Sequence, residues 1–83
     1  MLNLPIIEVP IVTGPTGIAY VKGTEVHIED VISAYEDGES AEDIAAAHEG
    51  LRLTDVYLVI SFYLKNRHDV EVYLAGRQHR YAA

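Results

Sequence analysis

Residues 40–65 read SAEDIAAAHEGLRLTDVYLVISFYLK, and this stretch decides the fold. Ser40, followed by two acidic residues, is typical of a capped helix start, and Gly50 is typical of a residue just beyond a helix end. The apolar residues between them recur at helical spacing. We therefore expect a short helix over residues 40–48.

The second half of this stretch predicts a longer helix over residues 54–65. Thr54 is a good N-terminal cap, and Asp55 favours the first turn electrostatically. The β-branched residues within 56–64 favour a strand, so a strand is the alternative for this segment. We prefer the helix because a cap precedes it and because the residues before it already follow a helical rhythm.

A helix over residues 54–65 would be apolar on two sides. The first face contains four apolar residues: Val56, Val59, Ile60 and Tyr63. The second face contains Leu58 and Phe62, which lie beside charged residues. A domain of this size rarely covers both faces of one helix. We therefore expect Leu58 and Phe62 to contact another chain, either in a homodimer or in a complex with a partner.

Upstream of this stretch, the sequence predicts a β-hairpin over residues 6–22. Two segments rich in β-branched residues flank residues 13–17, which consist of Gly, Pro and Thr. Pro5 and Pro10 cannot donate backbone hydrogen bonds, so the first strand should be short, bulged or at an edge. An apolar helix face then follows at Ile28, Val31, Ile32 and Tyr35.

Downstream, we expect a short fourth helix that ends at Gly76, followed by a polar tail over residues 77–83. The chain is expected to form a single domain over residues 1–83, with the hairpin at 6–22 and a helical core within 27–75. Its predicted fold class is α+β, mainly α.

The composition excludes several classes of protein. With 83 residues, of which 49% are hydrophobic, the chain can build one core, and without Cys it has no disulfide or thiolate zinc site. No apolar run reaches the roughly 18 residues needed to span a membrane, and the N-terminus lacks the features of a signal peptide. We therefore expect a cytoplasmic protein without a membrane partner.

The net charge of −7 is distributed unevenly. Residues 1–50 contain one Lys and ten acidic residues, whereas residues 51–83 contain five basic and three acidic residues. The acidic cluster at 36–49 predicts a solvated helix face or, alternatively, a surface that presents carboxylates to a basic partner. Phosphates need clustered Lys and Arg, so the net charge argues against nucleic-acid binding by charge alone.

No pattern typical of catalysis or metal binding is present in the sequence. The four His residues lack the spacing of metal ligands. Ser40 and Thr54 are explained as caps, and no base can be assigned to the other hydroxyl residues. Residues 14–17 resemble half of a phosphate loop, but the Lys and the helix that should follow are missing. We expect no enzyme activity, no metal and no cofactor.

Three motifs follow one another along the chain: KGTEVHI at residues 22–28, DGESAEDIA at 37–45 and LTDV at 53–56. In this order they resemble the domain-of-unknown-function 433 family, over roughly residues 6–75. The chain departs from the family pattern at Glu25 and His27, where members usually have Arg and Pro, and at residues 49–50, where a Pro is common.

This resemblance implies a trihelical, homeodomain-like core in which residues 40–48 and 54–65 form a helix-turn-helix. Several members look like VapB-type antitoxins, which are encoded beside toxins with a PIN-like ribonuclease fold. The exposed surface of the third helix would then face DNA with four candidate residues: Arg52, Thr54, Tyr57 and Lys65. Since this set is poor in groups that bind phosphates and base edges, we expect autoregulatory DNA binding from the complex with the toxin rather than from the chain alone.

The function that the resemblance implies is that of an antitoxin-like binding protein, which dimerises through its hairpin and third helix and neutralises a partner toxin, a PIN-like ribonuclease, by direct contact. Arg77 and Arg80 join Leu58 and Phe62 as expected partner-binding residues, because Arg can pair with the carboxylates that hold metal in such nucleases. The alternative is an acidic interaction protein or a DNA-mimic inhibitor that dimerises and does not bind DNA.

Overall fold

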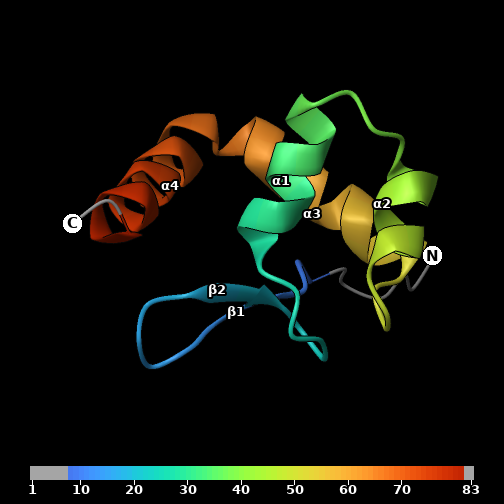
Figure 1. Cartoon of the computed structure of the whole chain (residues 1–83), viewed down its shortest axis with the longest axis horizontal. Helices are drawn as coiled ribbons and strands as arrows, with labels where there is room; N and C mark the ends of the chain where they lie inside the picture. Colours follow the sequence, from blue (N-terminus) through green and yellow to red (C-terminus); the bar gives the residue numbers. More distant parts are fainter. Residues whose placement is uncertain (1–7, 82–83) are drawn as a thin grey trace, which may run out of the picture.

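The computed structural model describes the backbone of residues 8–81 and the side chains of residues 8–77. A two-stranded antiparallel hairpin is followed by four helices, which confirms the α+β, mainly α class (Figure 1). The elements are β1 (Ile11–Thr13), β2 (Ala19–Val21), α1 (Ile28–Glu36), α2 (Ala41–Ala47), α3 (Leu53–Lys65) and α4 (Arg67–Tyr81). Residues 6 and 7 of the expected hairpin lie outside the described residues.

The hairpin is short and pairs in a single register. Val12 lies opposite Tyr20, and the strands are closed by hydrogen bonds from Gly14 N to Ile18 O (2.8 Å) and from Lys22 N to Pro10 O (2.7 Å). Gly17 has a positive φ of 84°, which glycine adopts without strain and which the turn requires. β1 begins directly after Pro10, as expected for a residue without a backbone donor.

The turn between β2 and α1 is closed by one threonine. Thr24 Oγ1 donates to Val21 O (2.8 Å) and accepts from Val26 N (3.0 Å), so a single hydroxyl satisfies two backbone groups. This turn places Val26 and Ile28 in the core, and α1 starts there with His27 as a cap residue that makes no side-chain capping bond.

The predicted helix-turn-helix is present as α2, the turn at residues 48–52, and α3. Ser40 caps α2 as predicted, because its Oγ accepts from Asp43 N at 3.1 Å. The prediction that Thr54 caps α3 is wrong. The helix begins one residue earlier, at Leu53, and Arg52 occupies the cap position without a side-chain bond. The strand alternative for this segment is excluded by the thirteen-residue helix.

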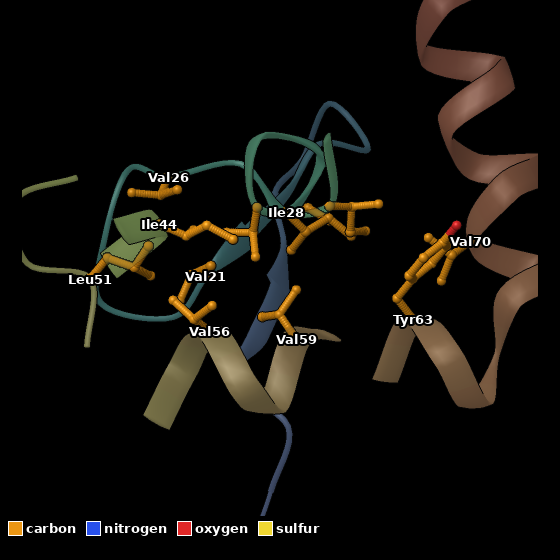
Figure 2. Packing of buried hydrophobic residues seen from close by; sticks show 12 residues of the cluster. Val21, Val26, Ile28, Ile44, Leu51, Val56, Val59, Tyr63 and Val70 are labelled. Atoms are coloured by element: carbon orange, nitrogen blue, oxygen red, sulfur yellow. The ribbon is translucent and has the colours of Figure 1, made fainter. Parts of the chain in front are cut away.

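The core lies where α1, α2 and α3 meet the hairpin. Val21, Ile44 and Val56 point toward one another in Figure 2, and all three are buried. On α3 the predicted face is confirmed, since Val56, Val59 and Tyr63 are buried and Ile60 is partly buried against the same cluster. Tyr63 and Val70 extend this core to the junction of α3 and α4 (Figure 2).

Helix α4 corrects the expected C-terminal end of the fold. The helix does not stop at Gly76 but continues through it to Tyr81, so residues 77–81 of the predicted polar tail are helical. The helix projects from the body of the molecule (Figure 1). The radius of gyration of 13.5 Å exceeds the value of about 12 Å expected for a compact chain of this length, and the extents are 54 × 25 × 22 Å.

Candidate interaction surface

The exposed side of α3 carries a row of large apolar side chains. Leu53, Tyr57 and Leu64 are 39%, 51% and 49% exposed, and Ile60 lies between them partly buried. Their spacing of i, i+4, i+7 and i+11 aligns them along one side of the helix. We call these four residues the α3 stripe. It contains three of the six large apolar side chains that are exposed among residues 8–77.

The α3 stripe adjoins the buried side of the helix and therefore extends the core to the surface. Val56, Val59 and Tyr63 attach α3 to the rest of the domain, so the stripe is held on a rigid element. A group of exposed apolar side chains on one helix face is typical of a surface that contacts another protein.

The four predicted DNA-contact residues are divided between the two ends of α3. Arg52, Thr54 and Tyr57 are exposed near its start. Lys65 is its last residue, which at 1.5 Å per residue lies about 12–20 Å from these three residues along the axis. Two of the four already have acidic neighbours: Arg52 Nε lies 4.0 Å from Asp55 Oδ2, and Tyr57 OH donates to Glu42 Oε1 at 3.3 Å. The helix therefore offers few free groups for phosphates.

Leu58 and Phe62, the predicted partner-binding pair on α3, are half-buried rather than fully exposed. Phe62 packs against the core and lines an apolar groove of about 240 Å³ between the hairpin, α3 and α4. The groove is also lined by residues of all three elements, among them Ile11, Thr13, Ala19, Val70 and Tyr73. The hairpin and α4 thus cover part of the second apolar face that the sequence predicted.

Arg77 lies in a place that the sequence did not indicate. Its side chain is only 5% exposed, and its Nε and Nη2 lie 2.9 and 2.8 Å from Glu29 Oε1 on α1. The same carboxylate oxygen lies 3.3 Å from Nδ1 of His27. Arg77 is therefore engaged within the chain and does not stand in an exposed tail. The side chain of Arg80 lies outside the described residues.

A second polar group joins α1, α3 and α4. Tyr63 OH donates to Glu36 Oε1, and this hydrogen bond, followed by burial, raises the pKa of Tyr63 above its ordinary value. Arg67 lies over the Tyr63 ring at 5.2 Å and contacts Glu36 at 3.5 Å. Its Nε donates to Glu71 at 3.2 Å, and this bond raises the pKa of Arg67 further. The group attaches the start of α4 to the core.

The acidic side chains of residues 36–49 are exposed, and one of them, Glu42, contacts the α3 stripe. All six acids in the predicted cluster are exposed: Glu36, Asp37, Glu39, Glu42, Asp43 and Glu49. Glu42 makes this contact through Tyr57. Among the side chains of residues 8–77, no three His, Asp or Glu groups gather closely enough to hold a metal ion.

The sequence prediction missed Leu53 and Leu64. Their spacing of i, i+4, i+7 and i+11 with Tyr57 and Ile60 is a signal in the sequence that could have identified them. By contrast, no local pattern connects Arg77 with Glu29, since the two residues are separated by 48 positions.

No helix in the described part of the chain has both the length and the apolar character to cross a membrane. Residues 16–63 match a protein family described as a protein of unknown function, DUF433. The match covers more than half of the chain, from the hairpin turn to the buried Tyr63, and leaves out α4. No curated protein and no solved structure matches the chain.

Proposed function

The chain belongs to the DUF433 family, and we propose that it works as an antitoxin-like binding protein, which dimerises and neutralises a partner toxin by direct contact. The observation that carries this proposal is the α3 stripe. In a DNA-binding helix-turn-helix protein, the second helix of the motif lies in the major groove, whereas the corresponding helix here, α3, presents apolar side chains. The partner that we propose is a PIN-like ribonuclease.

The energetics of the α3 stripe favour a protein partner over DNA. Full burial of a Leu or an aromatic side chain contributes about 1.5–3 kcal/mol. Leu53, Tyr57 and Leu64 are 39%, 51% and 49% exposed, so a partner could still bury a large part of their surface. Tyr is also enriched among the residues that dominate binding energy at protein interfaces. A DNA surface would instead need several basic groups, and α3 has only Arg52 and Lys65 on or beside it.

The acids beside the stripe set the chemistry of the proposed partner surface. Glu42 and Asp55 lie next to Tyr57 and Arg52, and the exposed acids of α1 and α2 lie beyond them. A partner with an apolar patch and a basic rim would be complementary to this arrangement. Autoregulatory DNA binding, in this proposal, belongs to the complex, because the toxin must supply positive charge that this chain lacks.

The test is co-expression with the protein encoded by the neighbouring gene, with a tag on this chain alone, followed by size-exclusion chromatography and a toxicity assay. We expect a stoichiometric complex and loss of toxicity. Tyr57→Lys and Leu64→Lys should each weaken the complex by about tenfold or more, since each buries a charge in the interface. Val72→Lys is the matched control, because Val72 is a comparably exposed apolar residue on α4 and lies outside the stripe.

Two outcomes would contradict the proposal. In the first, no complex forms and the neighbouring protein remains toxic when this chain is present. In the second, a complex forms and both stripe variants bind as tightly as Val72→Lys, which would move the interface away from the stripe. Circular dichroism on each variant excludes loss of fold as the cause of weak binding.

A second function, an acidic interaction protein or DNA-mimic inhibitor, is favoured by the exposed acids of α1 and α2. Spaced carboxylates on a rigid surface can occupy the DNA site of a basic protein. This function predicts that the chain displaces DNA from a basic partner in a salt-dependent manner. Replacing Glu39, Glu42 and Asp43 together by neutral amides should then remove the competition, whereas the stripe variants should retain it.

A further inference from the structure

We propose that the outer edge of β1 pairs with β1 of a second copy of this chain, so that two hairpins join into one four-stranded antiparallel sheet. This inference rests on the dimer in the proposed function and assigns its interface. It depends on four observations: the direction of the backbone groups in β1, the contrast with the edge of β2, the absence of charge from the hairpin, and the exposure of Val12.

The backbone groups of β1 alternate between its two sides. Pro10 O and Gly14 N bond to β2, so Val12, which has the same parity, also directs its N–H and C=O toward β2. Ile11 and Thr13 therefore direct their backbone groups outward. Ile11 N is satisfied locally by Val9 O at 2.8 Å. Thr13 N–H meets no acceptor within the described part of the chain.

The outer edge of β2, by contrast, is satisfied within the chain. Ala19 N donates to Tyr73 OH on α4 at 2.8 Å, and Val21 N donates to Val26 O at 2.8 Å. Both outward N–H groups of β2 thus have acceptors from other elements. Unpaired backbone groups along an exposed edge strand are a template for pairing with another chain, so the difference points to β1 as the edge that is open to another strand.

A symmetric register satisfies the open groups of β1. If two copies of β1 pair antiparallel about a two-fold axis at Val12, Thr13 N–H of each copy faces Ile11 C=O of the other. Two equivalent hydrogen bonds form, and the pair of Val12 side chains meets at the axis. The same pairing extends the sheet from two strands to four, and a two-stranded sheet is marginal by itself.

The charge distribution favours a second copy as the occupant. The chain has a net charge of −7, so two copies repel each other, and a contact surface free of acidic groups adds least to this repulsion. Residues 9–21 contain no Asp, Glu, Lys or Arg, which makes the hairpin suited to self-association. Edge strands of monomeric proteins are typically protected by charged side chains, and β1 has none.

The side chains of β1 add apolar area on both faces of the proposed joint sheet. Val12 is 45% exposed on one face. On the other face, Ile11 and Thr13 line the groove that also contains Phe62. Pairing would bring the second copy's strand to the open side of this groove. Phe62, a predicted partner-binding residue, would thereby lie close to the dimer interface, while the α3 stripe remains free for a different protein.

The experiment combines sedimentation equilibrium with amide hydrogen exchange on the full chain. We expect the wild type to sediment at twice its mass of 9.2 kDa and to protect the Thr13 amide in a concentration-dependent manner. Thr13→Pro removes the outward donor without touching a bond to β2, and Val12→Lys places two charges at the axis. Each should weaken dimerisation by about tenfold or more. Leu64→Lys is the matched control and should dimerise like the wild type.

Three outcomes would overturn the inference. A wild-type chain that stays monomeric at high concentration excludes the self-pairing. A dimer that persists in both hairpin variants places the interface elsewhere. Thr13 protection that arises only with the toxin present assigns the edge to that partner instead. Because Leu64→Lys impairs toxin binding and the hairpin variants impair dimerisation, failure of this inference is distinguishable from failure of the proposed function. The wild-type exchange data decide the matter even if a hairpin variant fails to fold.

Discussion

Helices α3 and α4 have similar lengths but are attached to the domain in different ways. α3 buries Val56, Val59 and Tyr63 against the hairpin, α1 and α2. Among its described side chains, α4 buries a single apolar residue, Val70, packs Tyr73 and Leu74 partly buried against the core, and also makes polar contacts to distant positions. These contacts are Tyr73 with Ala19, Arg77 with Glu29, and Arg67 with Glu36.

The difference indicates two levels of stability in one small domain. Apolar packing is shared by many atoms and fails cooperatively, whereas individual polar contacts open locally. The boundary also coincides with the family match, which ends at Tyr63 and does not include α4. We therefore expect the region of residues 16–63 to unfold as one unit and α4 to detach at a lower free energy. Four predictions test this comparison, from the largest effect to the smallest.

The largest effect should come from the core under α3. Ile44 is 1% exposed, and Ile44→Ala should lower the free energy of unfolding by about 2–5 kcal/mol, because it removes buried methyl groups and leaves a cavity. Urea denaturation followed by circular dichroism measures the change. Val72→Ala, an exposed α4 site, is the control and should shift stability by less than about 0.5 kcal/mol. Equal losses of stability in Ile44→Ala and Val72→Ala would contradict the expected difference between the core that holds α3 and helix α4.

The next effect should come from the ion pair that attaches α4. Arg77→Met leaves Glu29 with an uncompensated charge, but Glu29 is 25% exposed, so the cost should be about 1–3 kcal/mol rather than that of a fully buried pair. Hydrogen exchange should rise in α4 and stay unchanged in α3. The double variant Glu29→Gln with Arg77→Met should recover part of the loss, since no buried charge then remains unpaired. Faster exchange in α3 as well would show that the helices unfold together.

A smaller effect is expected from the second attachment of α4. Tyr73→Phe keeps the ring in the groove and removes the hydroxyl that accepts from Ala19 N–H. The free energy of unfolding should fall by about 0.5–1.5 kcal/mol, the net contribution of one hydrogen bond. The exchange rate of the Ala19 amide reports the change directly. Unaltered protection of Ala19 in this variant would contradict the role of Tyr73.

The smallest effect concerns the junction of the two helices and depends on pH. The pKa of Tyr63 is raised in the folded state, so the folded chain holds the phenolic proton more tightly than the unfolded chain does. Stability from this group is complete below the unfolded pKa of about 10 and is lost as pH rises through the folded value. From pH 9 upward, the free energy of unfolding should therefore fall more steeply in the wild type than in Tyr63→Phe. Parallel pH profiles would contradict the raised pKa.

Local patterns in the sequence predicted the parts of the fold that depend on neighbouring residues. The spacing of Val56, Val59 and Tyr63 identified the buried face of α3, and Ser40 identified the start of α2. The cap of α3 was misassigned because Thr54 has the preferred chemistry, although the helix begins at Leu53. Capping preference is worth only about 1 kcal/mol, so packing of Leu51 and Val56 decides the boundary.

The length of α4 was not predictable from local patterns. Gly76 within a helix costs about 1 kcal/mol relative to Ala, which favours an end at that point. The helix continues because Tyr73 and Arg77 find partners 54 and 48 positions away. Such contacts follow from the tertiary arrangement and leave no periodic signal in the sequence. The same reason explains why Arg77 was assigned to an exposed tail.

The hydrogen bond from Ala19 N to Tyr73 OH sets a limit on how far the sheet can grow. A sheet with two open edges can add another chain at each edge and so grow into a filament. In this hairpin one edge is terminated by α4 and by Val26, so pairing through β1 uses the open edge and the assembly closes after two chains. In the proposed dimer, Tyr73 therefore ends the sheet on the β2 side, so an uncharged hairpin can pair with one further copy without growing into a fibre.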